Sequence, residues 1–322
     1  LVTLQRVDRH TVRMNLPVPY RPILSALTSL PVLPAHLLRP LIQDRGIEAF
    51  NTGWGSPASG VKDVVGTGPF MLSELVPGSM LRLARNPHYG RREGSLHLDG
   101  APYLDEIIEL LEVDRDTKLL MFQIGELDFY ETSDLDVAQG GMETLVRNAD
   151  EGEYRLIDGG QSLRSNHFVS FNLKPGAVSE ELGGVFRDLR FRRAVSLLVD
   201  RERILKEVCQ GYGHLDGSPE RDASPFHLPL PPGGFDPRRA GELLDELRLV
   251  DRDGDRLREL PSGAPLAFTL LSNRENPLRA DMGRIITGSL REAGIDARLE
   301  LAPYDEVIAK LMVSFAWEAV LL

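Results

Sequence analysis

Residues 265–301, PLAFTLLSNRENPLRADMGRIITGSLREAGIDARLEL, carry the clearest secondary-structure signal in the chain. The runs Pro265–Leu271 and Ile295–Leu301 predict two strands. The segment Leu278–Ala293 predicts a helix, because its apolar residues recur every three or four positions, at Leu278, Met282, Ile285, Ile286 and Leu290. Gly294 follows, where a helix often ends on a glycine. Strand, helix and strand in this order predict an α/β fold with a parallel or mixed sheet covered by helices.

The sequence on both sides of this stretch continues the alternation. Asp188 and Asp200 each precede an amphipathic segment and suit helix N-caps. Asp236-Pro237 has the N-cap and following proline that begin many helices. A helix at Asp305–Val313 and a strand at Trp317–Leu322 are expected after the last strand of the quoted stretch. The second half is therefore predicted to be a regular α/β domain.

The first half predicts shorter strands. Thr11–Leu16 alternates apolar and polar residues, the pattern of a half-buried strand. Met71–Val76 and Met80–Leu83 flank Pro77-Gly78 and predict a β-hairpin. The other expected elements are strands at Ile107–Val113, Leu127–Tyr130 and Phe168–Asn172, and a helix between the first two with Asp116 as N-cap, Leu120, Met121 and Ile124 on its apolar face and Gly125 at its end.

Composition excludes several classes of protein. A length of 322 residues predicts two or three domains. The net charge of −11 disfavours nucleic-acid and anionic-membrane partners. No apolar run reaches the ~18 residues that a membrane span needs. The single cysteine, Cys209, rules out an intrachain disulfide and is expected to be a buried structural residue.

The motifs that could carry chemistry have simpler structural explanations. Gly66-Thr67-Gly68 is expected to be a turn, because Pro69 and a hairpin follow it where a phosphate-binding loop needs a helix. Asp251–Asp255 predicts a solvated acidic turn, with adventitious Ca²⁺ binding as the alternative, since its glycine position does not fit an EF-hand. The acid pair Asp134 and Asp136 is expected to be solvated charge.

Neither catalysis nor a dedicated metal site is predicted. The seven histidines show no paired spacing, and a nucleophile motif such as Gly-x-Ser-x-Gly is absent from the sequence. The chain is therefore expected to have no catalytic residues, no cofactor and no metal centre.

A set of ordered motifs resembles one protein family. Val65–Phe70 (VGTGPF) followed by Arg85–Tyr89 (RNPHY) is similar to the "GTGPY … RNPxYW" signature of bacterial extracytoplasmic solute-binding proteins, family 5. The family's dipeptide, oligopeptide and nickel-binding members serve ABC importers. Further similar stretches are Pro102–Ile107, Phe122–Asp128, Phe171-Asn172, Asp188–Ala194 and Val199–Glu202. One departure is Gly90, where the family usually has Trp. The resemblance covers nearly the whole chain.

The resemblance implies a periplasmic-binding-protein-like α/β fold of type II, with mixed sheets covered by helices and incomplete lobes. Residues 1–60 are expected to be a remnant of lobe II and its connection to lobe I. Residues 61–163 are expected to be the central part of lobe I, and residues 164–322 most of lobe III. The chain opens and stops in strand-like sequence, so a fragment lacking N- and C-terminal parts is expected.

The resemblance also implies a function without chemistry. The protein would be the substrate-binding component of an ABC importer, capturing a peptide-like solute between its lobes and delivering it to permease subunits. The family's contacts imply two ligand-binding segments, with the residues Tyr130, Glu131, Thr132, His167, Phe168 and Ser170. A monomer is implied, periplasmic or extracytoplasmic and membrane-associated, with no nucleic-acid partner.

Two questions stay open at the level of the sequence. The alternative function is a ligand-sensing domain of the same fold fused to a regulator, which a signal peptide or a DNA-binding domain in the flanking gene sequence would decide. The identity of the ligand also stays open, between a peptide, a nickel complex, a sugar and another solute. We expect this chain alone to bind peptides more weakly than micromolar, because the family's acidic ligand loop and the opposing lobe are missing from it.

Overall fold

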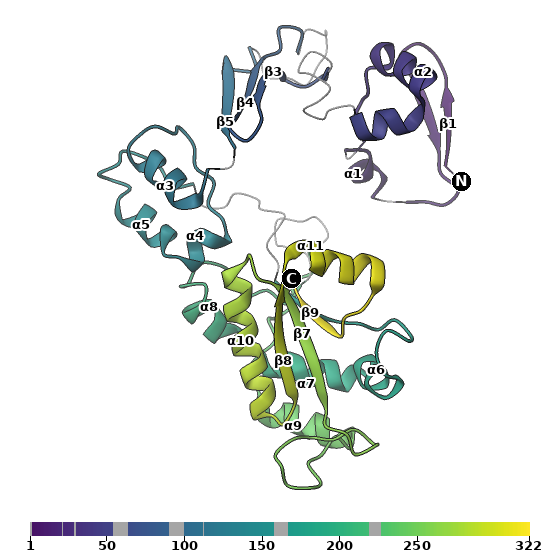
Figure 1. Ribbon diagram of the computed structural model, residues 1–322, viewed down its shortest axis with the longest axis vertical. Coiled ribbons are helices and arrows are strands. Elements are labelled where there is room, and N and C mark those ends of the chain that lie inside the picture. Colours follow the sequence, from purple (N-terminus) through teal and green to yellow (C-terminus); the bar gives the residue numbers. More distant parts are fainter. Residues whose placement is uncertain are drawn as a thin grey trace. The chain divides into compact units, whose positions relative to one another are not determined.

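A computed structural model describes residues 2–20, 22–28, 30–53, 64–89, 100–111, 113–157, 167–218 and 227–322 (Figure 1). The chain divides into two compact units, residues 1–114 and residues 115–322. Gly66–Gly68 lies in the described part and Gly90 outside it. Each unit is described by itself below.

Unit 1–114 contains two antiparallel β-structures. Strands β1 (Thr3–Arg6) and β2 (Val12–Asn15) pair with each other. Strands β3 (Phe70–Val76), β4 (Met80–Arg85) and β5 (Glu106–Leu110) form a sheet in that order, which confirms the predicted hairpin. Strand β2 confirms the strand predicted at Thr11–Leu16, in which the apolar residues Met14 and Leu16 are half-buried and Val12 is exposed. The helices of this unit are α1 (Ile23–Thr28) and α2 (Ala35–Gly53).

Unit 115–322 is organised around a four-stranded mixed sheet. Its strands are β6 (Val169–Phe171), β9 (Ala319–Leu321), β7 (Ala267–Asn273) and β8 (Asp296–Ala302), in the spatial order β6-β9-β7-β8. Strand β7 runs parallel to both β8 and β9, whereas β6 is antiparallel to β9. This arrangement confirms the mixed sheet that residues 265–301 predict.

Five helices of the second half begin within one residue of their predicted start, and a sixth, α6, was not predicted from the sequence. They are α6 (Glu180–Arg187), α7 (Leu189–Leu198), α8 (Arg201–Glu207), α9 (Pro237–Glu246), α10 (Pro277–Glu292) and α11 (Tyr304–Ala309), which continues as a π-helical turn over Lys310–Ser314. The carboxylates of Asp188, Asp200 and Asp236 accept hydrogen bonds from backbone N–H groups in the first turns of α7, α8 and α9. These caps satisfy N–H groups that have no partner within the helix.

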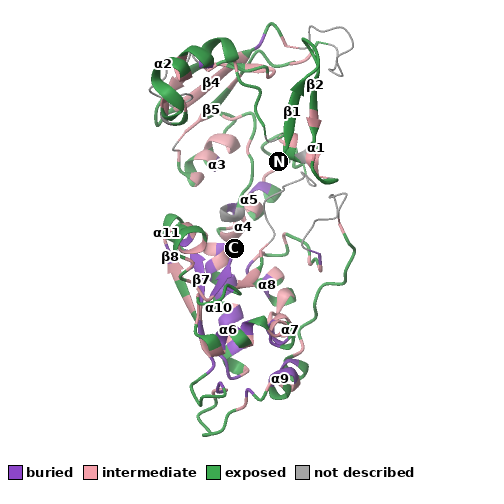
Figure 2. Ribbon diagram, turned by 90° about the vertical axis from the view of Figure 1, so that its right-hand side faces the viewer, coloured by how far each residue is buried: buried purple, intermediate pink, exposed green. Residues whose placement is uncertain are grey.

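The core of unit 115–322 lies on one face of the sheet. Phe268 and Leu270 of β7 point into it, while Leu271 points to a smaller cluster on the opposite face. Buried residues gather on β7, α10 and the helices beside them (Figure 2). Phe171, Phe186, Phe191 and Phe268 pack as one aromatic group with ring centroids 4.8–6.4 Å apart. Cys209 is half-buried against this core, in agreement with a structural role.

Three further helices, α3 (Arg115–Gln123), α4 (Asp134–Ala138) and α5 (Gly141–Arg147), complete this unit and correct two predictions. Asp116 lies inside the first turn of α3 and is not its N-cap, a position where a carboxylate still interacts favourably with the helix dipole. Leu120 and Ile124 are exposed, whereas Leu119 is the buried residue of the helix.

The strand predicted at Leu127–Tyr130 is also absent from the described part of the structure. The helix ends with the N–H of Glu126 donating to the carbonyl of Met121, and Gly125 has a φ of +80°. The chain then runs as an irregular segment into α4. An apolar run becomes a strand only where another strand can pair with it, and the contacts of Tyr130 described below are made with helices.

Candidate functional site

The first candidate segment is the edge strand β6. Phe168 and Leu322 exchange two backbone hydrogen bonds, of 2.9 and 3.2 Å, and the N–H of Asn172 donates to the carbonyl of Glu318 over 2.8 Å. In an antiparallel pair such hydrogen-bonded residues alternate with residues whose backbone groups point the other way. The backbone groups of Val169 and Phe171 therefore face the outer edge of the sheet. Among the described strands, β6 is the terminal one on this side.

The side chains of this segment divide between the two faces of the sheet. Phe171 and Val169 pack against the large core. By alternation, Phe168 and Ser170 lie on the opposite face, where Phe168 is 51% exposed and Ser170 is half-buried. His167, immediately before them, is half-buried. Phe168 and Ser170, two of the predicted ligand residues, thus lie on the face of the sheet opposite the large core.

Asn172 fixes the end of β6 to the segment before β9. Its side-chain amide donates to the carbonyls of Phe315 and Trp317, at 3.0 and 2.9 Å, and its Oδ1 accepts the N–H of Lys174 at 3.1 Å. The residue is buried, with 3% of its surface exposed. Phe315 has a φ of +57°, in the left-handed region, and the Lys174 ammonium lies 3.3 Å from the centre of its ring. Asn172 therefore holds a sharp turn that the backbone alone disfavours.

The second candidate segment joins α3 to α4. The hydroxyl of Tyr130 donates to Oδ1 of Asp136 over 2.6 Å, and the Tyr130 ring lies 5.7 Å from the ring of Phe122 on α3. Glu131 and Thr132, the next two residues, are exposed. Of the three predicted ligand residues in this segment, Tyr130 is thus engaged within the protein, and Glu131 and Thr132 face outward.

Asp136 is not the solvated charge that the sequence suggested, because only 1% of its surface is exposed. Its Oδ1 also accepts from Nε of Arg115 at 3.1 Å, and its Oδ2 accepts from the N–H and the hydroxyl of Ser133 at 2.7 and 2.8 Å. Four donors thus surround the carboxylate. A buried carboxylate is tolerated only with this kind of compensation, which Arg115, Tyr130 and Ser133 supply.

The protonation states of this cluster follow from its contacts. Burial raises the pKa of Asp136, but the hydrogen bonds from Tyr130, Ser133 and Arg115 outweigh burial and lower the pKa below its ordinary value. Burial and the hydrogen bond to Asp136 raise the pKa of Tyr130. At neutral pH the pair is therefore an ionised carboxylate and a neutral phenol, which form a charge-assisted hydrogen bond.

Sequence reasoning missed the two buried polar residues that organise these segments. The role of Asp136 could have been predicted locally, because Ser133 and Asp136 have the spacing of a pair that caps the start of a helix. Asn172 lies in the quoted Phe171-Asn172 motif, but its partners are more than 140 residues away. No local pattern could have indicated them.

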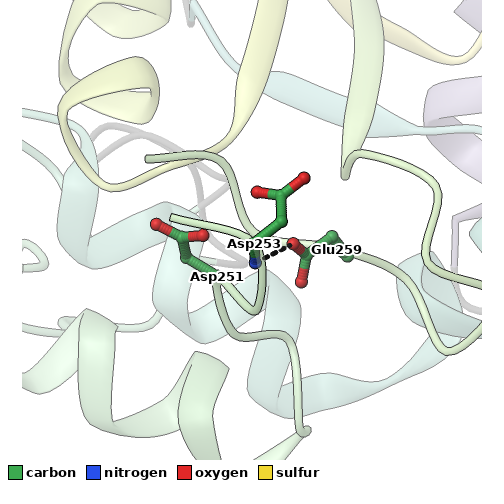
Figure 3. Close-up of side chains that lie close together, drawn as sticks. All are labelled: Asp251, Asp253 and Glu259. Carbon is green, nitrogen blue, oxygen red and sulfur yellow. Dashed lines mark hydrogen bonds between the residues drawn. The ribbon is translucent and has the colours of Figure 1, made fainter. Parts of the chain in front are cut away.

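The acidic turn at Asp251–Asp255 forms a separate cluster (Figure 3). Oxygen atoms of Asp251, Asp253 and Glu259 lie within 4.8 Å of one another. Both oxygens of Glu259 accept the N–H of Arg252, at 2.9 and 3.0 Å, and Asp251 accepts the N–H groups of Gly254 and Arg256. The carboxylates thus accept hydrogen bonds from backbone N–H groups of the turn itself. Asp251 and Asp253 are exposed, as predicted.

A pocket of about 400 Å³ opens between α9, α10 and the turn that contains Asp251. Its lining includes Phe235, Gly241, Arg258 and Glu292. The guanidinium of Arg258 is held by the carbonyls of Leu249 and Ala293 and by Asp245. The six predicted ligand residues are not among the residues that line this pocket. It is therefore separate from both candidate segments.

Comparison with known proteins identifies the family. Residues 1–320 match the family described as bacterial extracellular solute-binding proteins, family 5 Middle. A probable ABC transporter-binding protein of Deinococcus radiodurans is 25% identical over 320 residues, which cover 96% of this chain and 52% of that protein. The oligopeptide-binding protein AppA of Bacillus subtilis is 24% identical over 291 residues, which cover 89% of this chain and 47% of that protein.

Solved structures show the same fold. The periplasmic oligopeptide-binding protein of an oligopeptide ABC transporter from Thermotoga maritima matches with a TM-score of 0.72 and 20% identity, over 99% of this chain and 56% of that chain. This similarity confirms the predicted periplasmic-binding-protein-like α/β fold. The chain spans about half the length of the curated relatives it matches. Since the family match extends over residues 1–320, the chain belongs to the bacterial extracellular solute-binding proteins of family 5.

Proposed function

We propose that the protein is the substrate-binding component of an ABC importer and captures a peptide-like solute. The observation that carries this proposal is the family match over residues 1–320. The name of a relative agrees with it, because AppA of Bacillus subtilis is named an oligopeptide-binding protein. The family consists of binding proteins, which agrees with the expectation that this chain is not an enzyme. Permease subunits are the proposed membrane partners, and a compartment outside the cytoplasm is the proposed location.

The proposed ligand site uses both candidate segments, with Tyr130, Glu131, Thr132, His167, Phe168 and Ser170 as its residues. Its central feature is the outer edge of β6, where the backbone groups of Val169 and Phe171 can pair with an extended peptide. Main-chain pairing of this kind binds peptides of varied sequence, because side chains contribute little to it. The exposed Phe168 ring supplies apolar contact on one side of that edge.

A further part of the proposal concerns the organisation of the chain. The three-lobe division, with boundaries near residues 60 and 163, is proposed from the family resemblance. None of the described helices is long and apolar enough to cross a membrane.

Calorimetric titration of the full-length protein tests the proposal. The probes are trialanine and the same peptide methylated on the backbone nitrogen of its middle residue. We expect trialanine to bind, and the methylated peptide to bind about tenfold more weakly, because one main-chain hydrogen bond is lost and a buried acceptor is left without a donor. Equal affinity for the two peptides would exclude pairing with the β6 edge. No binding of either peptide would contradict the capture of short peptides.

A further inference from the structure

We propose that Asp136 is a positioning residue of the ligand site, which holds Tyr130 and Ser133 in place and so presents Glu131 and Thr132 in a fixed conformation. This inference rests on the proposed function, because it concerns how one of the two ligand segments is held. It also assigns the Tyr130 hydroxyl to the protein interior, so that Tyr130 supports the site and its hydroxyl does not contact the solute.

The first step is the geometry on both sides of the exposed pair. Tyr130 is fixed at two points, its ring against Phe122 and its hydroxyl 2.6 Å from Asp136. Ser133 is fixed at two points as well, because its N–H and its hydroxyl both donate to Asp136, over 2.7 and 2.8 Å. Only Glu131 and Thr132 lie between these anchored residues. One carboxylate thus closes a four-residue loop whose two central residues are exposed.

The second step is the attachment of Asp136 itself. It belongs to α4, which packs against α10 and the large core through Val137 and Ala138. Arg115 donates to Asp136 and, through Nη1, to Oε1 of Gln139 over 2.6 Å, so the first residue of α3 is bound to the same helix. The loop is therefore anchored to α10 and the large core of unit 115–322.

The third step is the tightness of this arrangement. Gly141, the first residue of α5, approaches so closely that a Cβ atom there would lie 2.5 Å from Nη2 of Arg115 and 2.9 Å from Oδ1 of Asp136. Real Cβ contacts are longer than this, so only glycine fits without displacing the charged pair. A packed and fully hydrogen-bonded charge restricts its neighbours to one arrangement, and a loop restricted before binding loses less entropy when the ligand arrives.

The fourth step is the range of pH over which the arrangement holds. The pKa of Asp136 is lowered in the folded protein. Its stabilising contribution is therefore complete above the ordinary carboxyl pKa of about 4 and is lost as the pH falls below that value. The pKa of Tyr130 is raised, so the phenol stays protonated through the ordinary titration range of tyrosine. The loop is thus held at every physiological pH.

Two variants of the full-length protein test the inference, with one matched control. Tyr130→Phe removes a single hydrogen bond and keeps the ring, and Asp136→Asn removes the charge. Asp128→Asn removes an exposed carboxylate from the segment that joins α3 to α4, two residues before this loop, and serves as the control. Amide hydrogen exchange of the segment 130–137 and calorimetric titration with trialanine are measured for each, together with the melting temperature.

We expect exchange at the Ser133 amide to accelerate about tenfold or more in Tyr130→Phe and Asp136→Asn, since hydrogen bonds to a charged group are lost or weakened. Affinity for trialanine should fall roughly three- to tenfold in Tyr130→Phe while its melting temperature changes little. Asp128→Asn should match the wild type in all three measurements. A fall in affinity without a fall in melting temperature separates positioning from a merely structural role.

Three other results are informative. Unchanged exchange in Tyr130→Phe would overturn the inference directly. Faster exchange with unchanged affinity for trialanine would also overturn it, because the loop would then be held without any consequence for the ligand. If the wild type does not bind trialanine, the proposed peptide function fails, while the exchange measurement still decides whether Asp136 holds the loop.

Discussion

Replacement of Phe191 by alanine is expected to lower the free energy of unfolding of unit 115–322 by about 3–5 kcal/mol. Phe191 is completely buried, and its ring lies 5.4 Å from Phe171, 5.7 Å from Phe186 and 6.4 Å from Phe268. The substitution removes apolar burial, leaves a cavity and breaks three aromatic contacts at the centre of the core.

Denaturant unfolding followed by the fluorescence of Trp317 measures this effect, with Trp54 replaced by phenylalanine so that one tryptophan reports on this unit. The matched control is Phe129→Ala, at a phenylalanine that is 76% exposed. Its free energy of unfolding should change by less than about 0.5 kcal/mol. A loss below about 1 kcal/mol in Phe191→Ala would contradict the aromatic core described here.

Replacement of Asn172 by alanine is expected to cost about 2–4 kcal/mol of stability in the same unit. The side chain is buried, and its amide is the donor to two carbonyls, those of Phe315 and Trp317. Alanine would leave both carbonyls and the N–H of Lys174 without this partner. The cost of unsatisfied buried groups exceeds the net gain from the hydrogen bonds themselves. The turn before β9 should loosen first, which hydrogen exchange at residues 315–318 would detect.

The Asn172→Asp variant gives this account a specific dependence on pH. A carboxylate would place negative charge against two carbonyl oxygens, which raises its pKa in the folded state above the ordinary value. A group with a raised pKa stabilises the fold below its unfolded pKa of about 4, and that stability is lost as the pH rises. The stability difference from the wild type should therefore shrink as the pH falls from 7 to about 4. A difference that stays constant or grows would contradict the donor role of the Asn172 amide.

Local sequence patterns predicted the regular elements of the second half well, because their determinants are local. The caps at Asp188, Asp200 and Asp236 act within the first turns of their own helices. The apolar spacing of Leu278–Leu290 similarly depends only on helix periodicity. In these helices the residues that determine the structure lie within the helix or next to its first turn.

The predictions that were wrong concern residues whose environment comes from elsewhere in the chain. Leu127–Tyr130 has a strand-like pattern, but the Tyr130 side chain contacts Phe122 and Asp136, and the segment is irregular. Asp136 was expected in solvent because nothing in its immediate sequence shows that Arg115, 21 residues earlier, will reach it. Hydrophobicity predicts burial of apolar groups, whereas burial of a charge depends on partners brought together by the fold.

The six predicted ligand residues rest on the family resemblance. The structure shows that Glu131, Thr132 and Phe168 are exposed and that the Tyr130 hydroxyl is engaged within the protein. Which of them touches a solute stays a prediction.

Native mass spectrometry of the full-length protein, purified without denaturant, tests the central claim of solute capture most directly. We expect a mass above that of the sequence which disappears on denaturation, with the released species identified as peptides. A bare protein that also shows no mass shift after trialanine is added would contradict peptide capture, and a released metal complex or sugar would assign the site to another class of solute.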